Sequence, residues 1–550
     1  MRHILALIPL FFVTTLFAQV RQTEHVELPI DTSHGTNYQL VKAGNEGVLC
    51  LLESQKVENN NKVRLQFTFF DTDLHTKWEQ GYLVKNTAKL LGTSYDDGFI
   101  YILIQSKEHE YNIMKLNLSD GIISQIAFAD FKDFIITHFD ATKGTLLLGG
   151  NIKGKPAVIL KRYDESNKPI VLPSINQLKA KLIDVVIDDK NQELVVLLDK
   201  RRPISDRALY VNRYALDGGI IKNTEITLST EFNLITYRPH MADDGSLLLF
   251  GSYGMKTETL AQGIYSLTIK DGKLLENRFY DFGYLKNFFN YLPKNKRERY
   301  ISKIRRKLKE GSRKRFGYRL FIHDLEVTDD RIILSGESYD PQTEYVRKYD
   351  MMAASNRAAT YSYYPSARRY ASLFYSGGYI PTAFAQDALR DREWMPSEYR
   401  YEHAFALGFS KSGALLWDNS YTFDDTKSNF PIEMTQASAI NDTLAFLEYT
   451  EEKYHFKMSV KSDYVEENVS IKLPEIFEGD EQKTLDHGGL MRWYGRNFLM
   501  SGIKDFDNKL DKERKRHVFF ISKFTFNPEW VDKPEEEEEA KNKEKEDRVE

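Results

Sequence analysis

One short pattern of polar and apolar positions recurs at long intervals along this chain. It consists of a polar turn, three apolar residues, one variable residue and a glycine. The pattern occupies residues 145–150, 246–251, 331–336 and 497–502. Related apolar runs lie at 48–52, 100–104, 194–198 and 444–447. Such recurrence is typical of an array built from one supersecondary unit.

Each unit contains about 50 residues and four strand-like segments. Third segments often end in a turn pair that supplies the positive φ of a tight hairpin. These pairs lie at 120–121, 217–218, 271–272 and 412–413. The fourth segments at 272–282 and 413–423 share Gly, Leu-Leu, Tyr and Phe at the same spacing. We count about eight units, with first strands beginning near Tyr38, Lys89, Phe134, Lys181, Asn233, Leu320, Ile432 and Gly489.

Four antiparallel strands per unit in a radial array form a β-propeller blade. We therefore predict an all-β fold, an about eight-bladed β-propeller over 19–530, with seven blades as the alternative. The last unit shows three strands and ends at 517–526. The segment 25–30 precedes the first unit, and we expect it to supply the missing strand, because closing the ring removes an exposed sheet edge.

The phrase Gly413-Ala-Leu-Leu-Trp417 resembles the tryptophan-bearing repeat of bacterial quinoprotein-type propellers and of the outer-membrane assembly lipoprotein related to them. The resemblance covers the periodicity of most of the chain, although the tryptophan occurs clearly in one unit only. The chain also lacks the lipid-accepting cysteine of that lipoprotein. The resemblance implies a propeller that presents loops to partners, and it identifies no functional residue.

The first residues have the layout of a secretory signal peptide. Arg2 and His3 precede an apolar run over 4–17, and Ala18-Gln19 offers a small-residue cleavage point. We predict a signal peptide at 1–18 and a periplasmic, secreted or cell-surface location, with a retained anchor as the alternative. The single cysteine, Cys50, lies inside an apolar run, so we expect a buried, inert thiol and no disulfide.

Two long interruptions of the repeat fall at 284–317 and 339–401. The first separates a fourth strand from the next first strand, and the second separates a second strand from a third. In an up-and-down unit, both kinds of junction emerge on the same face. Long loops on a rigid scaffold usually serve recognition, so this face is the expected functional face.

The first insertion predicts a helix over 294–311, with Tyr300, Ile304 and Leu308 on one narrow apolar stripe. Residues 286–315 contain 13 basic and 2 acidic side chains, although the formal net charge of the chain is −4. The helix suits an anionic lipid or an acidic protein surface; the alternative is a docked helix with solvated charges. The candidate partner-binding residues are Arg297, Arg299, Lys303, Arg305, Arg306, Lys307, Arg313, Lys314 and Arg315.

The second insertion is rich in tyrosine and arginine, which often anchor protein interfaces and stack on sugars. Its candidate partner-binding residues are Tyr361, Tyr363, Tyr364, Arg368, Arg369, Tyr370, Phe374 and Tyr375. The alternative is a small satellite core that caps the ring. Beyond both insertions, residues 531–550 include five consecutive glutamates and almost no apolar side chain, which predicts a disordered acidic tail.

The sequence contains no His-Glu-x-x-His motif, no Gly-x-Ser-x-Gly elbow and no phosphate-binding or dinucleotide glycine loop. We therefore expect no metal, no cofactor and no catalytic residue that the sequence alone can identify. First strands line the central channel of a propeller, so their polar residues are candidates for acid–base work or for simple hydration of the channel. These channel candidates are His138, Arg238, His240, His323, Asp324 and Arg492.

The leading hypothesis is an exported, non-enzymatic scaffold of the bacterial cell envelope. Its insertions would bind an envelope protein complex, an outer-membrane protein or an anionic membrane surface, and no nucleic acid. One alternative is a propeller enzyme, a hydrolase or lyase acting on a glycan. That alternative requires two carboxylates, or a histidine and a carboxylate, to converge in the channel. The other alternative is a sensor of a small ligand or glycan.

Overall fold

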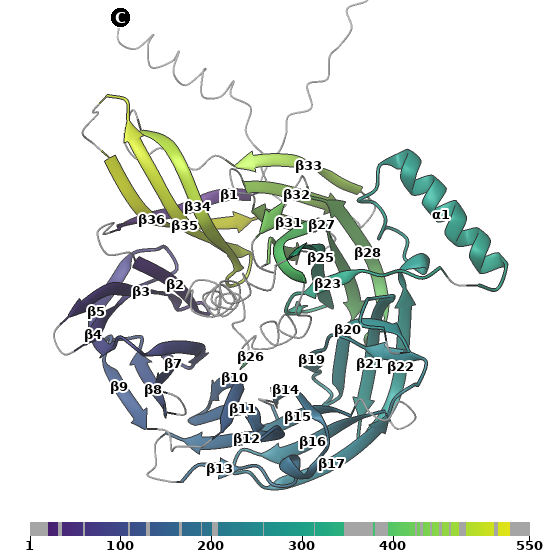
Figure 1. Cartoon of the computed structure of the whole chain (residues 1–550), viewed down its shortest axis with the longest axis horizontal. Coiled ribbons are helices and arrows are strands. Elements are labelled where there is room, and N and C mark those ends of the chain that lie inside the picture. The colour runs from purple at the N-terminus through teal and green to yellow at the C-terminus, as the bar shows by residue number, and fades with distance from the viewer. Residues whose placement is uncertain are drawn as a thin grey trace, which may run out of the picture.

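Eight antiparallel sheets follow one another around a ring in the computed structural model (Figure 1). The structure describes residues 20–30, 36–58, 61–107, 110–127, 133–163, 168–188, 190–200, 207–256, 258–312, 314–345, 378–379, 394–423, 426–428, 433–440, 443–449, 454–460, 464–471, 480–510 and 515–527. The predicted signal peptide at 1–18 and the predicted acidic tail at 531–550 lie outside these residues.

The first half of the ring contains four sheets. Their strands are β2 (Thr36–Ala43), β3 (Gly47–Glu58), β4 (Lys62–Phe70) and β5 (Thr76–Lys85); β6 (Lys89–Asp96), β7 (Phe99–Lys107), β8 (Glu110–Asn117) and β9 (Ile123–Ala127); β10 (Phe134–Thr142), β11 (Thr145–Ile152), β12 (Lys155–Arg162) and β13 (Ile170–Val171); and β14 (Lys181–Asp188), β15 (Glu193–Lys200), β16 (Ala208–Ala215) and β17 (Ile220–Thr227). A short 3-10 helix, η1 (Ile175–Gln177), precedes β14.

The second half also contains four sheets. Their strands are β18 (Phe232–Leu234), β19 (Arg238–Met241), β20 (Leu247–Met255), β21 (Gly263–Lys270) and β22 (Lys273–Asp281); β23 (Arg319–Ile322), β24 (Glu326–Val327), β25 (Arg331–Tyr345), β27 (Trp394–Ser410), β28 (Leu415–Thr422) and β29 (Lys427–Ser428); β30 (Thr435–Ile440), β31 (Thr443–Tyr449), β32 (Tyr454–Val460) and β33 (Tyr464–Ile471); and β34 (Asp480–Arg492), β35 (Asn497–Asn508) and β36 (Lys515–Phe526). The sheets follow one another in the predicted order, although β34 begins nine residues before the predicted Gly489.

The N-terminal strand closes the ring, as the sequence predicts. Strand β1 (Val20–Pro29) pairs antiparallel with β36, from Val20 opposite Phe526 to Pro29 opposite Val518. The last sheet therefore has the order β1-β36-β35-β34, and its outer strand comes from the other end of the described chain. Buried side chains of the last and first sheets pack together, since Cys50 and Phe70 share one cluster with Leu499 and Ile521.

The glycine of the recurring pattern is explained by the close approach of the first strand to the second. A Cβ atom on Gly251 would lie 1.9 Å from the carbonyl oxygen of Thr236, and one on Gly150 would lie 2.0 Å from that of Ile135. Non-bonded carbon and oxygen atoms do not approach this closely. Any larger residue would therefore push the first strand away from its neighbour.

The apolar runs of the second strands form the core between neighbouring sheets. Leu49 and Leu51 on β3, for example, pack in one cluster with Ile100 and Ile102 on β7. Cys50 points to the opposite face of β3 and is also buried, which raises the pKa of its thiol above the ordinary value. The expectation of a buried thiol is therefore confirmed.

Both predicted insertions leave the ring at the same end of the sheet that contains β25. The single α-helix in the described residues, α1 (Lys294–Lys309), follows the short 3-10 helix η3 (Phe282–Tyr284), and the chain then enters β23. Arg319, at the start of β23, pairs with Tyr339. From there β25 continues outward to Tyr345, which pairs with Trp394 at the start of β27.

The second interruption is shorter than the predicted 339–401, because both flanking strands extend into it. Residues 346–377 and 380–393 lie outside the described residues. Between them, β26 (Gly378–Tyr379) pairs with the channel side of β10, with Tyr379 opposite His138. Part of this insertion therefore reaches the first strand of a sheet on the far side of the ring (Figure 1).

Candidate functional site

A buried carboxylate, Glu337, joins two neighbouring sheets at the channel. It lies on β25, is fully buried, and accepts hydrogen bonds from the main-chain nitrogens of Met434 (2.8 Å) and Thr435 (2.7 Å). The Thr435 hydroxyl donates a further bond of 2.9 Å to the same oxygen. On the other side, the Nε2 atom of His323 lies 3.4 Å from this carboxylate.

His323 and the nearby Glu433 have mutually dependent protonation. Burial lowers the pKa of His323, but the carboxylates of Glu433 and Glu337 outweigh this effect and hold it above its ordinary value. Burial raises the pKa of Glu433 to about 7, although the positive charge of His323 opposes the rise. The site therefore binds protons near neutral pH, as general acid–base chemistry requires.

Two arginines hold the neighbouring first strands in place. The guanidinium of Arg238, on β19, donates to the carbonyl oxygens of His323 (2.9 Å) and Ile322, and lies 3.5 Å from the Asp324 carboxylate. Arg492, on β34, forms a 2.8 Å ion pair with Glu326 on β24. These contacts join the sheets that contain β19 and β34 to the segment 322–326.

Asp324 interacts with several other charged side chains around the channel. Its carboxylate interacts electrostatically with Lys42 on β2, with Asp184 on β14 and with Glu433. Burial lowers the pKa of Lys42 and raises the pKa of Asp184 to about 7. We call Lys42, Asp184, Arg238, His323, Asp324, Glu326, Glu337, Glu433 and Arg492 the channel cluster.

The other two channel candidates are His138 and His240, and burial lowers the pKa of both. His138 is buried, its ring nitrogens contact the Thr137 hydroxyl (2.8 Å) and the Ile183 carbonyl (2.9 Å), and burial lowers its pKa to about 4. Its imidazole is therefore neutral at neutral pH. His240 lies on β19, and burial likewise lowers its pKa. Of the six predicted residues, the structure gathers Arg238, His323, Asp324 and Arg492, and His138 lies 3.9 Å from Asp184 of the same cluster.

The described residues contain no group of three or more His, Cys, Asp or Glu side chains placed to hold a metal ion. Among the helices of this part of the chain, none is long and apolar enough to cross a membrane.

Replacing Glu433 with glutamine should flatten the dependence of stability on pH. A carboxyl group whose pKa rises on folding takes up a proton, so its contribution falls as pH increases from its unfolded value to about 7. Between pH 5 and pH 8, the unfolding free energy of the glutamine variant should therefore fall by roughly 1–3 kcal/mol less than that of the wild type. Chemical denaturation at both pH values measures the difference, and an unchanged slope would contradict the assignment.

Helix α1 is docked on the propeller by its apolar stripe. Ile304 is buried and Tyr300 is half-buried in a cluster that includes Phe282, Phe288 and Phe316. The segment before the helix is also fixed, since the main-chain nitrogen of Asn287 donates a 2.7 Å hydrogen bond to Asp418 on β28. The helix is therefore docked on the ring, and Figure 1 shows α1 at the outer rim beside β28.

The basic side chains of this insertion fall into two groups. Some contact the protein: Arg297 donates to Asn290 (2.9 Å), the Lys314 ammonium lies 3.1 Å from the centre of the Tyr300 ring, and Arg315 pairs with Glu258 (3.4 Å). The others on the helix are exposed: Lys294, Lys296, Arg299, Lys303, Arg305, Arg306, Lys307 and Lys309. Arg306 lies 3.9 Å from Glu310, and Arg313 lies outside the described residues.

An open pocket of about 320 Å³ lies along one side of α1. Its walls are Tyr291, Leu292, Lys296, Arg299, Tyr300 and Lys303. The Tyr291 ring is held from behind by His403, at 3.8 Å between ring centres and 4° between ring planes. His403 is fully buried, and burial lowers its pKa to about 3, so it is a neutral support for the pocket wall.

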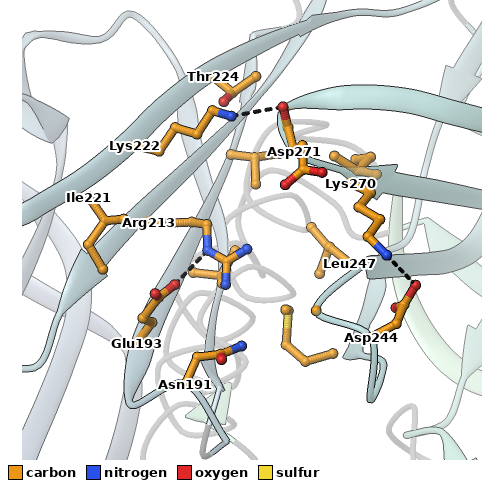
Figure 2. Close-up of a pocket in the computed structure, with 16 residues that line it drawn as sticks. Asn191, Glu193, Arg213, Ile221, Lys222, Thr224, Asp244, Leu247, Lys270 and Asp271 are labelled. Carbon is orange, nitrogen blue, oxygen red and sulfur yellow. Dashed lines mark hydrogen bonds and ion pairs between the residues drawn. The ribbon is translucent and has the colours of Figure 1, made fainter.

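A second pocket of about 320 Å³ lies between β15–β17 and the turns around Gly245 and Gly272 (Figure 2). Its charges are matched inside the pocket: Arg213 pairs with Glu193, and Lys270 pairs with Asp244, both at 2.7 Å. Lys222 donates a 2.8 Å bond to the Asp271 carbonyl. A charged ligand would have to displace these pairs, so this pocket is a weaker candidate than the one beside α1.

The eight predicted partner-binding residues between Tyr361 and Tyr375 lie outside the described residues. The sequence alone does not single out Lys42, Asp184, Glu326, Glu337 or Glu433 of the channel cluster, or Lys296 beside α1. Glu337 directly follows the glycine of a recurring pattern, so its position on a second strand was readable, but its burial was not. Lys296 lies seven residues before Lys303, which is a helical spacing that would have placed both on one face.

Comparisons with known proteins identify no family: no protein-family profile and no curated protein matches this chain. Among solved structures, the WD40 domain of SCAP from fission yeast is 7% identical, with a TM-score of 0.42 over 92% of this chain and 98% of that one. The polysaccharide lyase Uly1 is 8% identical, with a TM-score of 0.37 over 80% and 90%.

The β-propeller domain of the Trilobed protease from Pyrococcus furiosus is 9% identical, with a TM-score of 0.31 over 79% of this chain and 93% of that chain. Similarity at this level carries no statement about activity. The ring of four-stranded antiparallel sheets, closed by the N-terminal strand, is the stronger observation. This chain is a β-propeller.

Proposed function

We propose that this protein is an exported, non-enzymatic scaffold of the cell envelope that binds an acidic partner protein through helix α1. The observation that carries the proposal is the orientation of the helix. Ile304 is buried against the propeller and Tyr300 is half-buried, while Lys294, Arg305 and Lys309 are exposed. A helix that needed its apolar stripe to enter a lipid layer would not bury it in the protein.

Positive charge at the rim of a rigid ring favours an encounter with an acidic surface. Lys294, Arg305 and Lys309, which we call the outer triple, have no ion-pair partner among the described residues. Their side chains therefore remain available to a partner. Export agrees with the signal peptide that the sequence predicts, and the partner is then a protein of the same compartment.

Changing the outer triple to glutamine should weaken the partner complex by about tenfold, since each exposed charge contributes up to about 1 kcal/mol to such a contact. Crosslinking in cells followed by mass spectrometry, and then titration of the crosslinked partner, measures the loss. Glutamine is a good helix former, so the melting temperature should not change. Full retention of partner affinity by a folded variant would refute the proposal.

Binding to lipid vesicles is the outcome that would favour a membrane surface over a partner protein. Binding of the protein to anionic vesicles, without a crosslinked protein that depends on the outer triple, would replace the acidic protein with a lipid surface as the partner.

The channel cluster supports a second candidate, an enzyme that acts on a glycan. His323 lies between two carboxylates, and the pKa values of Glu326 and Glu433 are raised by burial to about 7. Changing His323 to asparagine should abolish such an activity. Absence of depolymerisation across neutral and acidic polysaccharides with the wild-type protein would remove this candidate.

A further inference from the structure

The pocket beside α1 contains three cationic side chains that share one helix face. Lys296, Arg299 and Lys303 are spaced by three and four residues, and an α-helix has 3.6 residues per turn, so they form one stripe. The outer triple lies on the opposite side of the same helix. The two groups are chemically matched, because each contains two lysines and one arginine.

No carboxylate within the described residues forms an ion pair with Lys296, Arg299 or Lys303. Like charges three and four residues apart destabilise an isolated helix, because the side chains are neighbours on its surface. The ammonium of Lys314 adds positive charge 3.1 Å from the centre of the Tyr300 ring. The pocket therefore concentrates positive charge that nothing in the described structure neutralises.

The aromatic wall of this pocket is fixed. The Tyr291 ring stacks on His403, and its hydroxyl forms a 2.9 Å hydrogen bond with the hydroxyl of Tyr318. Beside it, Leu292 supplies an apolar surface. A ligand with an anionic group and a compact organic body would place the anion against the helix and its body against Tyr291 and Leu292.

We propose that this pocket binds a phosphomonoester, with its phosphate between Lys296, Arg299 and Lys303 and its organic body, such as a sugar ring, against Tyr291 and Leu292. A phosphate dianion has more charge than a single carboxylate and offers several acceptor oxygens to three cations. The planar guanidinium of Arg299 matches two of those oxygens at once. The volume of about 320 Å³ lies at the lower end of the range for small-ligand pockets, about 300–1,000 Å³.

This site is distinct from the partner surface of the proposed function, because the outer triple lies on the other side of α1. The phosphate could belong to a soluble sugar phosphate or to a lipid headgroup. Both sources present the same group to the pocket. The experiment separates them with a soluble probe and a vesicle probe.

Calorimetric titration of the full-length protein with glucose 1-phosphate tests the proposal, with glucose and inorganic phosphate as reference ligands. Glucose 1-phosphate should bind more tightly than inorganic phosphate, and glucose should not bind. Changing Lys296, Arg299 and Lys303 to glutamine should weaken binding by about tenfold or more, because charge-assisted hydrogen bonds are lost. The glutamine variant of the outer triple should bind glucose 1-phosphate as the wild type does.

Sedimentation with vesicles of phosphatidylcholine, with and without phosphatidic acid, identifies the source of the phosphate. Binding that depends on phosphatidic acid and on the pocket residues, without affinity for glucose 1-phosphate, would assign a lipid headgroup. Equal weakening by both triple variants would show diffuse attraction and overturn the pocket, as would failure to bind either probe. Neither of these results would affect the proposed function, which depends on the partner affinity of the outer-triple variant.

Discussion

Replacing Glu337 with alanine is expected to lower the free energy of unfolding by about 3–5 kcal/mol, the range for removing one partner of a buried ionic group. The carboxylate is fully buried and accepts three hydrogen bonds from Met434 and Thr435. Its loss leaves those donors without their acceptor, and it leaves His323 beside a small cavity. Because these bonds join two neighbouring sheets, the ring should open first at this junction.

Guanidinium unfolding followed by circular dichroism measures this loss. Glu337→Gln should be milder, since the amide oxygen can still accept hydrogen bonds although the charge beside His323 is gone. Glu58→Ala is the matched control, because Glu58 forms a 2.9 Å ion pair with Arg64 at the surface, where solvent screening leaves such a pair little effect on stability. A loss for Glu337→Ala no greater than that of the control would contradict the bridging role.

The repeat could be predicted from the sequence because the contacts that require it join residues close together in the chain. The second strand of each unit is buried on both faces, which requires a run such as Leu247-Leu-Leu249. The following glycine is fixed by contact with the first strand, which lies only a short distance away in the chain. The apolar run recurs with every sheet and the glycine with four of them, so the pattern survives even where the rest of the unit varies.

Only some residues of the channel cluster could be predicted from the sequence, because its contacts join segments that lie far apart in the chain. Arg238 and His323 were identifiable as polar residues on first strands, but 85 positions separate the residues of their hydrogen bond. Glu433 has no local signal, since its pKa depends on burial and on His323 from the preceding sheet. The sequence therefore indicated which strands supply the channel and not which charges meet there.

For helix α1, likewise, the bounds could be predicted from nearby residues, whereas the contacts with the ring could not. Its bounds follow from Pro293, from the spacing of Tyr300 and Ile304, and from Gly311. The contact of this stripe with Phe282 and Phe316 is a property of the folded ring.

These contacts also decide which variants of the insertion are informative. Deletion of the whole insertion at 284–317 would remove Phe288 and Phe316, which are buried in the core beneath α1. Such a deletion would disturb folding as well as binding. Charge substitutions on the exposed faces of α1 therefore test function more cleanly than deletion does.

Gly251→Ala should destabilise the propeller by about 3 kcal/mol or more, because the new methyl group overlaps the backbone. Its Cβ would lie 1.9 Å from the carbonyl oxygen and 2.7 Å from the carbonyl carbon of Thr236. That oxygen also accepts a 2.8 Å hydrogen bond from the Tyr265 hydroxyl. Relief of the overlap must move the first strand of this sheet, and with it Arg238 and its bonds to the neighbouring sheet.

Gly317→Ala is the matched control for this substitution. Its Cβ would lie 3.5 Å from the nearest atom, on Leu260, which is an ordinary contact distance. We expect a change within about 0.5 kcal/mol, since alanine fits there and also reduces the freedom of the unfolded chain. Denaturant midpoints of the two variants measure the contrast. Equal midpoints would mean that the first strand moves aside without loss of stability. The recurring glycine would then require a different explanation.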